Sequence, residues 1–556
     1  MGKKQFLKKD RKTQDITKQE AGFPPPSYAI LVGIIIVITG AILIFSNLSN
    51  RYLWEDEAET ALLGRNILTF GIPKAFDGKT LISQEVGRDY DVNYVWRWTP
   101  WLDKYITAAS FMVQGEGTFP ARFPFALLGL LSIVSLYFLA NLFFKDRWMA
   151  VLSMAFLAFS VPFLLYVRQC RYYSIAILGS IWTVYFFFAL LKKNKGAIPG
   201  FVIAMSLLFH SNYLTFLGTA FALMVCFLIF YFDTKVIRRV FLSYLLIFLI
   251  NLPWFVFFNI MGKAEEAEKL MPFGKNLFQY YTLINEFGLP QIALLLFFIL
   301  AAIFRKHNKF MNVIPARPFF FLLIFSMVYV IFISFAPWSF YRYVITLLPL
   351  FAILMAFMCR SLWSWNCTAA VLFSLCLLFT GVFQRISAYP FLDPAYLKAR
   401  EERADWRFDI AFPLGNYLYE ITHDLDGPIE GMVKFLQKNA KPNDRVFISY
   451  GDLPLKFYTK LEVKGGLTGE DLTEWPLPDW VIIRSFFRFG DREQLKQDAY
   501  KMGDYITHIF SRAQYKEVEI PYVDYWWENI PEPRLHVFRT PKEGQWVKIQ
   551  QRVSMD

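Results

Sequence analysis

The sequence predicts a polytopic α-helical membrane protein with a soluble α/β domain at its C-terminus. Of its 556 residues, 55% are hydrophobic and only 19% are charged, whereas soluble domains average about 25% charged residues. The hydrophobic residues gather in long uninterrupted runs, and a membrane-spanning helix needs roughly 20 such residues. This distribution excludes disordered, collagen-like and disulfide-scaffold proteins.

Eleven apolar runs are predicted to be transmembrane helices, of which the fifth is the shortest. They cover about 28–46, 120–144, 148–167, 171–191, 197–209, 212–231, 238–260, 288–304, 318–336, 341–359 and 363–383. The first run follows a long polar tail and has no convincing small-residue cleavage site. We therefore expect it to be a retained helix and not a signal peptide.

Lysine and arginine in the short connections predict the orientation of these helices, because basic residues are retained on the cytoplasmic side. The tail, residues 1–27, is rich in lysine, and every second connection after it is also basic. The tail should therefore be cytoplasmic, in a cell membrane of the inner or plasma type. The first loop, 47–119, and the C-terminal region, 384–556, should then lie outside, in the periplasm or the extracellular space.

The net charge of +12 raises the question of nucleic-acid binding. The tail and the basic connections account for more than this whole charge, so the basic character of the chain reflects its membrane topology. Anionic lipid of the inner leaflet is the partner that such charges indicate. We expect no nucleic-acid partner.

The first outer loop carries the strongest chemical signal. Glu55, Asp56 and Glu57 directly follow the first run, and apolar residues then recur at helical spacing. The pattern predicts an amphipathic helix that lies on the membrane surface and begins with these acids. Acids at a helix start are also favoured by the helix dipole, so a purely structural role is the alternative to catalysis.

Short motifs in a fixed order carry a resemblance to a known family. They are Asp56-Glu57-Ala58, Thr99–Ile106, Phe119–Gly129, Arg168–Ser174, His210–Asn212 and Tyr341–Pro349. Through them, residues 28–383 resemble the GT-C class of integral-membrane glycosyltransferases, in particular the protein O-mannosyltransferase and lipid A aminoarabinose transferase superfamily. The resemblance implies a GT-C fold in this region.

The resemblance also implies the reaction. A sugar would pass, with inversion, from a polyprenyl-phosphate donor to a lipid, glycan or protein acceptor on the outer face. Asp56 would be the general base that takes the proton of the acceptor hydroxyl. Glu57 would orient Asp56, hold the acceptor, or help bind a metal; a divalent metal at Asp56 and Glu57 is the one cofactor that the sequence suggests.

Cations at the outer helix ends are candidates for neutralising the departing phosphate, because arginine keeps its charge and matches phosphate oxygens. They are Arg171, Arg342 and Arg168, with His210 as a further phosphate contact. The alternative is that each arginine snorkels to the interface or pairs with a loop acid, and that His210 is a packing residue.

Further candidates for substrate contact are less specific: Asp103, Lys104, Tyr172, Asn212 and Tyr343. Asp103 and Lys104 lie where relatives place a lysine or an acid with prolines, but the pattern here is altered. The tyrosines could equally belong to the aromatic belt of the membrane interface.

The region 384–556 has the composition of a soluble domain. A helix is expected at 428–440, strands at 445–450 and 479–484, and another helix at 491–510, which indicates a small α/β domain. The resemblance implies that such a domain shapes acceptor access. Asp409, Asp452 and Trp526–Glu528 are candidates for acceptor contact, with surface or core roles as the alternative.

A secondary transporter or lipid-linked-sugar flippase is the alternative function, and a sensor is a third. Transporters tend to show inverted repeats and charged groups at the membrane midplane. In this chain no repeat is evident and the polar residues crowd the outer helix ends. The sequence therefore favours the enzyme.

Overall fold

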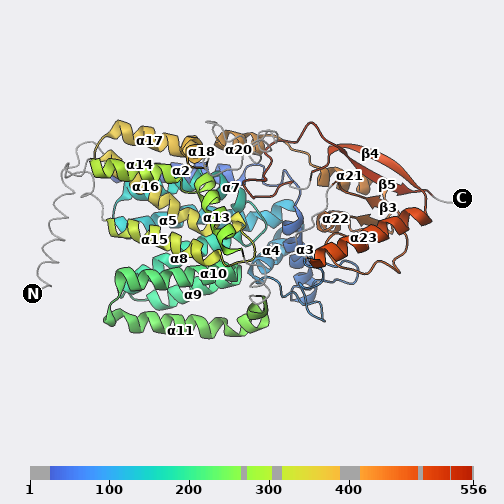
Figure 1. Ribbon diagram of the computed structural model, residues 1–556, viewed down its shortest axis with the longest axis horizontal. Coiled ribbons are helices and arrows are strands. Elements are labelled where there is room, and N and C mark those ends of the chain that lie inside the picture. The colour runs from blue at the N-terminus through green and yellow to red at the C-terminus, as the bar shows by residue number, and fades with distance from the viewer. Residues whose placement is uncertain are drawn as a thin grey trace, which may run out of the picture.

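The computed structural model describes residues 26–263, 272–303, 316–388, 413–485, 493–525 and 528–553. Most of the basic tail, together with Asp409, Trp526 and Trp527, lies outside these ranges. Figure 1 shows a bundle of long, roughly parallel helices at one end and an α/β domain at the other, with α3 and α4 between them. The predicted fold class is confirmed.

Each predicted apolar run contains an apolar helix, but not all are long single spans. Seven are long enough to span a membrane alone: α2 (Pro26–Phe45), α5 (Thr118–Phe144), α8 (Tyr173–Leu191), α10 with η1 (Tyr213–Tyr231), α11 (Thr234–Phe257), α15 (Ala316–Ile333) and η3 with α16 (Ile345–Trp363). Two bent helix pairs reach the same length and hydropathy only when their members are taken together: α6 (Arg147–Ala158) with α7 (Val161–Val167) and α13 (Phe273–Phe287) with α14 (Gln291–Ile303). The remaining two runs form the shorter helices α9 (Ala197–Ser211) and α17 (Cys367–Phe379).

The two bent pairs differ from the prediction: 148–167 is expected to be one span, and α13 precedes the expected span 288–304. The bend is 67° between α6 and α7 and 74° between α13 and α14. Pro162 follows the first break and Pro290 precedes α14. Proline has no amide hydrogen and disfavours helical geometry in the residue before it, so each helix ends and restarts in a new direction.

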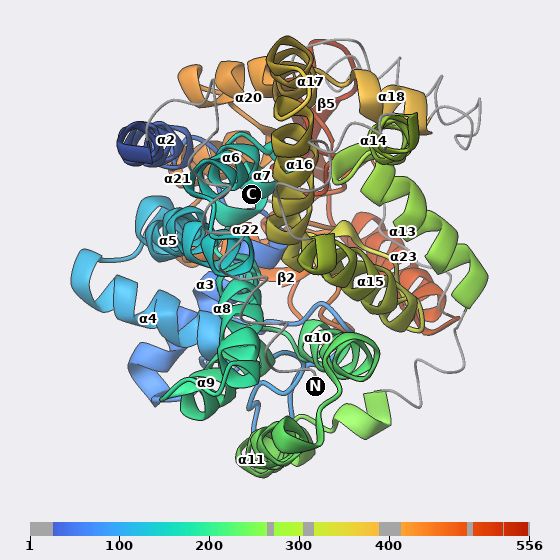
Figure 2. The same cartoon turned by 90° about the vertical axis from the view of Figure 1, so that its left-hand side faces the viewer.

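The helices of the bundle differ in how far they are enclosed. In the end-on view of Figure 2, α16 lies in the middle and α11 at the edge. Correspondingly, 94% of the α16 span is buried inside the protein, against 22% of the α11 span. The apolar surface that α11 leaves uncovered is what a helix facing lipid needs.

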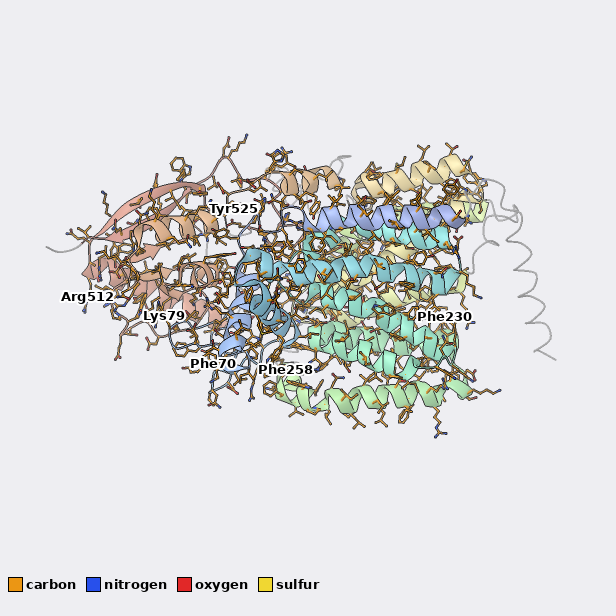
Figure 3. The ribbon with its side chains drawn as sticks, turned by 180° about the vertical axis from the view of Figure 1, so that it is seen from behind. Phe70, Lys79, Phe230, Phe258, Arg512 and Tyr525 are labelled. Carbon is orange, nitrogen blue, oxygen red and sulfur yellow. The ribbon has the colours of Figure 1, made fainter. Side chains whose placement is uncertain are left out.

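The two ends of the bundle have different neighbours. Figure 3 shows Phe230, near the basic connection between η1 and α11, at the end of the bundle far from the α/β domain. Phe258, at the other end of α11, lies toward that domain. The segments predicted to lie outside are thus gathered at one end. They include α3 (Glu55–Phe70) and α4 (Leu102–Gln114) of the first loop.

The α/β domain is built on one five-stranded sheet of order β2-β1-β3-β5-β4. Strands β1 (Arg445–Ile448), β2 (Glu462–Gly465) and β3 (Trp480–Ile482) are parallel, and β5 (Trp546–Arg552) is antiparallel to both β3 and β4 (Tyr515–Val523). The helices of the domain are α21 (Pro428–Asn439), α22 (Asp452–Thr459) and α23 (Glu493–Arg512). The predicted helices and strands of this region are therefore present.

Two helices of the predicted outer region belong with the bundle instead. They are α18 (Val382–Ala388) and α20 (Pro413–Thr422). Leu414, Tyr417 and Ile421 of α20 join the hydrophobic core of the bundle, and the Tyr417 hydroxyl donates to the Leu43 carbonyl at 2.7 Å. The sheet domain proper begins at α21.

Candidate active site

The three consecutive acids form the first turn of α3, where the free amide groups of a helix favour negative charge. The expected helix is present, but most of its residues are buried. It packs against α4 and against α22 of the sheet domain, between the bundle and that domain (Figure 1). The helix is therefore more enclosed by protein than its amphipathic pattern suggests, and its place at the membrane surface stays a prediction.

Asp56 lies between two arginines from distant parts of the chain. Its Oδ2 accepts from Arg342 Nη1 at 2.9 Å and from Arg171 Nη2 at 3.4 Å, and the residue is only 5% exposed. Arg171 comes from the connection between α7 and α8, and Arg342 from the short 3₁₀ helix η2 (Tyr341–Tyr343). The structure thus brings together three residues that the sequence analysis had proposed for one site.

The two arginines are held differently. Arg171 Nη1 also donates to the Asp56 carbonyl at 3.0 Å, to Glu59 Oε1 at 2.6 Å and to Thr60 Oγ1 at 3.1 Å. Arg171 is therefore tied to the start of α3, and its side chain is 7% exposed, against 22% for Arg342.

Arg342 lies against aromatic rings. Its guanidinium is 4.2 Å from the centre of the Phe340 ring and 5.7 Å from that of Tyr343. Ring faces attract and orient a cation without consuming its hydrogen-bond donors. Of the two arginines, Arg342 is the one that an incoming anion can reach.

Glu57 has a separate and fully buried environment. Arg122 of α5 holds it with two parallel bonds, from Nε to Oε1 at 2.8 Å and from Nη2 to Oε2 at 2.6 Å. The Cys170 amide donates to the same carboxylate at 2.8 Å, and Asn529 Nδ2 at 3.3 Å. Glu57 therefore joins α3 to α5 and to the C-terminal region. Arg122 had no predicted role, although it lies in the Phe119–Gly129 motif.

Glu55 faces the sheet domain. It lies beside Asp452 of α22, and Lys456 Nζ donates to Asp452 Oδ2 at 2.6 Å. Burial raises the pKa of Glu55 well above its usual value, and the neighbouring Asp452 carboxylate raises it further. Asp452, one of the suggested acceptor contacts, is thus part of a buried domain contact.

Arg168 lies apart from Asp56. Its Nη1 donates to the carbonyls of Leu43, Ile44 and Ser46, at 2.8–3.2 Å, and its Nη2 to that of Asn47 at 3.0 Å. These carbonyls end α2, where a helix has unpaired acceptors and partial negative charge. The structure therefore places Arg168 as a cap of the first helix.

His210 and Asn212 also have neighbours other than Asp56. The His210 ring packs edge-on against Phe209 and Trp254, at centroid distances of 5.2 and 5.3 Å. Asn212 is the N-cap of α10 and accepts from the Thr215 amide at 3.0 Å. The position of His210 agrees with the packing role considered as its alternative, and Asn212 has a capping role that the sequence did not indicate.

The remaining predicted residues divide into two groups. Tyr172 and Tyr343 lie near Arg342, the arginine that is paired with Asp56. Asp103 and Lys104 pair with each other in a buried contact of 3.0 Å, and Lys104 Nζ also donates to Thr99 Oγ1 at 2.7 Å and to the Pro100 carbonyl at 3.1 Å. Lys104 thus closes the turn that begins α4.

A C-terminal segment, residues 528–538, reaches the same region. Glu532 Oε2 accepts from the Tyr341 amide at 3.2 Å and from the Tyr166 hydroxyl at 3.3 Å. Burial raises the pKa of Glu532 to about 7, although nearby Arg534 and Arg342 act against this shift. No motif or spacing in the sequence links this segment to the first loop, so its place here is not predictable from the sequence.

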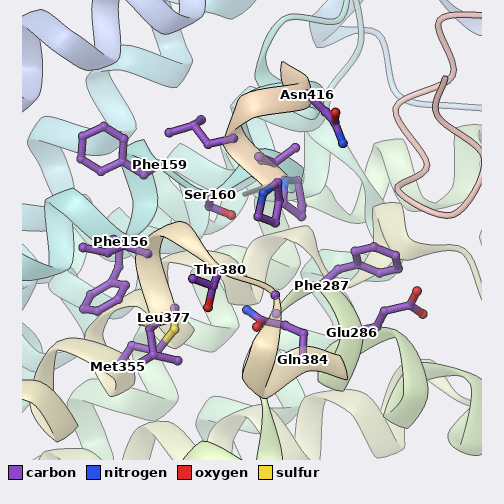
Figure 4. Close-up of a pocket in the computed structure, with 17 residues that line it drawn as sticks. Phe156, Phe159, Ser160, Glu286, Phe287, Met355, Leu377, Thr380, Gln384 and Asn416 are labelled. Carbon is purple, nitrogen blue, oxygen red and sulfur yellow. The ribbon is translucent and has the colours of Figure 1, made fainter. Parts of the chain in front are cut away.

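An apolar cavity lies in the bundle, and Asp56, Arg171 and Arg342 are not among its lining residues. It occupies the space at the two helix breaks, and Figure 4 shows Phe156, Phe159, Met355 and Leu377 around it, with Glu286 and Gln384 among its polar residues. Phe287, which also lines it, accepts from the Tyr341 hydroxyl through its carbonyl at 2.8 Å. One hydrogen bond therefore links the lining of the cavity to the residue that precedes Arg342 in the chain.

The acidic centre does not fit a divalent metal. Asp56 faces two guanidinium groups and Glu57 is paired with a third, so a cation placed between them would meet like charges. Within the described ranges, no group of three or more His, Cys, Asp or Glu side chains is arranged to hold a metal. The arrangement suits proton transfer and binding of an anion.

Comparison with known proteins gives one family match. Residues 99–257 match the model of the dolichyl-phosphate-mannose-protein mannosyltransferase family. This range covers α4, α5, the bent pair α6–α7 and the helices up to α11, and it includes Arg122 and Arg171. A comparison with curated proteins gives no significant match.

Solved structures resemble the chain to different degrees. The apo crystal structure of ArnT from Cupriavidus metallidurans superposes with a TM-score of 0.53 at 13% identity and covers 94% of this chain and 98% of its own. The undecaprenyl-phosphate-bound form of the same protein gives 0.49 at 13% identity, with 95% and 98% covered. The archaeal oligosaccharyltransferase AglB from Archaeoglobus fulgidus gives 0.46 at 11%, with 90% and 74% covered.

The likeness in fold thus extends over nearly the whole chain, whereas the likeness in sequence is confined to its middle. Both point to the same class of protein. The predicted resemblance is confirmed: the chain is similar to the GT-C membrane glycosyltransferases, in sequence over residues 99–257 and in fold over both of its parts.

Proposed function

We propose that the chain is a glycosyltransferase that moves a sugar from a polyprenyl-phosphate donor to an acceptor hydroxyl on the outer face of the membrane, with Asp56 as general base. The observation that carries this proposal is the meeting of Asp56, Arg171 and Arg342 at the end of the bundle nearest the sheet domain. The family matched by residues 99–257 is named for a dolichyl-phosphate-linked donor, which supports this donor class.

The chemistry needs one base and one anion site. The acceptor oxygen attacks the anomeric carbon while the bond from that carbon to the phosphate oxygen breaks. The hydroxyl proton passes to Asp56, and the electrons of the broken bond leave with the lipid phosphate. Attack on the face opposite the leaving group inverts the anomeric configuration.

The arginines support the anionic leaving group. Asp56 and Glu59 together balance Arg171 and Arg342, so the centre is neutral before substrate binds. A phosphate that approaches the more exposed Arg342 would share it with Asp56 and leave that carboxylate accessible to the acceptor. Arg171, held by four contacts to α3, is a positioning residue for Asp56.

The apolar cavity offers a place for the lipid part of a substrate. Its lining is mostly apolar, and Phe287, which lines it, accepts a hydrogen bond from Tyr341, the residue before Arg342. We infer that a hydrocarbon chain occupies this space while its polar head lies toward Arg342.

Asp56→Asn tests the proposal. The amide keeps the shape of the side chain but takes up no proton, so sugar transfer should fall by about 10²–10⁴-fold, the usual contribution of a general base. The measurement is transfer of radiolabelled sugar in membranes supplied with lipid-linked donor, with the thermal stability of the purified variant as a check on folding.

Asp77→Asn is the matched control. Asp77 lies in the same loop and caps a turn by accepting from the amides of Lys79 and Thr80. None of these contacts involves Asp56, Arg171 or Arg342. This variant should keep full transfer. Full activity in Asp56→Asn would show that Asp56 is not the general base. Movement of a solute across the membrane with no covalent product would show that the protein is a transporter and not an enzyme.

A further inference from the structure

A small polar cavity lies next to Glu57, because Arg122 and Asn529, which both bond to Glu57, are among its lining residues. Its walls come from the end of α2, the connection between α7 and α8, α20 and the 528–538 segment, and its charged or ionisable residues are Arg51, Arg122, Arg168, Glu420 and His536. Asp56, Arg171 and Arg342 do not line it. It offers about 20 Å³ to the centres of water-sized molecules, which is room for a water or a monatomic ion but not for a sugar.

Arg51 is the unusual residue of this cavity. It is 4% exposed, and among the described residues no acceptor forms a hydrogen bond with its Nε, Nη1 or Nη2. The nearest carboxylate oxygen, Glu420 Oε1, is 3.7 Å from Nε, beyond hydrogen-bond distance. A buried guanidinium with all its donors unused is costly, and buried charges in proteins are almost always paired and hydrogen-bonded.

The other basic residues of the cavity already have partners. Arg122 is paired with Glu57, and Arg168 caps α2 through neutral carbonyls. Each ring nitrogen of His536 faces an acceptor at 2.8 Å, the Ile530 carbonyl for Nδ1 and Glu420 for Nε2.

The charges around the cavity do not balance. Three arginines, Arg51, Arg122 and Arg168, face the carboxylates of Glu57 and Glu420. Glu528 acts on Arg51 from farther away and is itself engaged by the Ile429 amide at 2.9 Å. The two nearer carboxylates therefore leave one positive charge of the three arginines without a counterpart at the cavity.

We propose that this cavity binds a monatomic anion of the size of chloride, held by the Arg51 guanidinium. A water molecule could accept hydrogen bonds from Arg51, but it would leave the excess charge in place. The anion would join the first loop, the bundle and the C-terminal segment at one point. It would also keep Arg122 and Glu57 in position directly behind Asp56.

The first experiment measures the thermal stability of the purified full-length chain at equal ionic strength in chloride, bromide and gluconate. A ligand that binds only the folded state raises stability with its concentration. We expect apparent Tm values higher by about 2 °C or more in chloride and bromide than in gluconate, approaching a plateau as the halide concentration rises. Arg51→Met should remove this difference.

Arg65→Met is the matched control. Arg65 lies on the same loop and makes loose ion pairs with Asp77 and Glu116, at 3.8 and 3.9 Å, away from the cavity. Arg65→Met removes the same charge as Arg51→Met but leaves the cavity unchanged. The halide-dependent rise in Tm should therefore persist in this variant. Loss of the rise in both variants would show a general charge effect and overturn the proposal.

The second experiment needs no variant and therefore does not depend on whether Arg51→Met folds. Crystals of the wild-type chain grown in bromide should show one anomalous peak beside the Arg51 guanidinium. A peak there supports the proposal. Equal Tm values in the three salts, or density at this place without anomalous signal, would identify a water site and overturn it.

Discussion

Three neighbouring acids at the start of α3 have three different surroundings. Successive residues of an α-helix point about 100° apart, so Glu55 faces Asp452 of the sheet domain, Asp56 faces Arg171 and Arg342, and Glu57 faces Arg122. One short acidic run thereby serves one domain contact, one proposed catalytic centre and one anchor to α5.

At the same scale, the structure gives different surroundings to Arg342 and Arg168, which the sequence proposes for the same role. Arg342→Lys keeps the charge but loses the planar donor set that matches phosphate. We expect transfer activity to fall about 10- to 100-fold while the Tm stays close to that of the wild type. Steady-state kinetics with lipid-linked donor and thermal unfolding are the two measurements.

Arg168→Lys provides the comparison. An ammonium group cannot reach the carbonyls of Leu43, Ile44, Ser46 and Asn47 at once as the Arg168 guanidinium does. This variant should lose stability and keep its kcat. The reverse pattern, with activity lost at Arg168 and kept at Arg342, would contradict the placement of the phosphate at Arg342.

At the scale of elements, the two broken helices create the apolar cavity. Ser160 at the α6–α7 break and Gly288 at the α13–α14 break both line it. A helix broken within a bundle is tolerated where neighbouring segments satisfy its backbone or where it lines a cavity. The prolines that end these helices thus also leave space for a ligand.

Filling this cavity tests the inferred lipid site. Leu378→Trp places a larger ring in the lining and should raise the KM for the lipid-linked donor or acceptor by about tenfold. Leu372→Trp on the same helix is the control, because Leu372 is exposed on the outer surface of α17. Equal KM values in the two variants and the wild type would show that the lipid chain does not bind in this cavity.

At the scale of the whole molecule, buried acids hold the C-terminal segment against the rest of the protein. Glu528 accepts from the Ile429 amide at the start of α21. Burial raises the pKa of Glu528 from 4.5 to about 7, and the Ile429 amide and Arg51 act against this shift. The folded state therefore holds a proton that the unfolded chain releases at lower pH.

This shift predicts a pH dependence of stability. A carboxyl whose pKa is raised by folding contributes stability below its unfolded pKa, and the contribution is lost as the pH rises through its folded pKa. Between pH 6 and pH 8, Glu528 should therefore lower the free energy of unfolding by about 1.4 kcal/mol. The measurement is thermal unfolding of the full-length chain across this range.

Glu528→Gln should flatten this decline, because the amide does not ionise and still accepts from the Ile429 amide. Glu474→Gln removes an exposed carboxylate of the sheet domain and should leave the slope unchanged. A slope that is the same in wild type and Glu528→Gln would mean that Glu528 is ionised throughout this range.

The sequence by itself determined the membrane class, the positions of the apolar helices, the α/β character of the C-terminal region and the family resemblance. It also singled out Asp56, Arg171 and Arg342. These properties depend on composition, periodicity and short local motifs, all of which are readable along the chain.

Only the tertiary structure decided how the proposed residues divide between roles. It joined Asp56 to two arginines, placed Arg168 at the end of α2 and Lys104 in a buried turn, and brought Arg122 and Glu532 to the site. The sequence shows which side chains carry charge, but which charges meet depends on how helices far apart in the chain pack. Burial in that packing then determines whether each charge needs a partner.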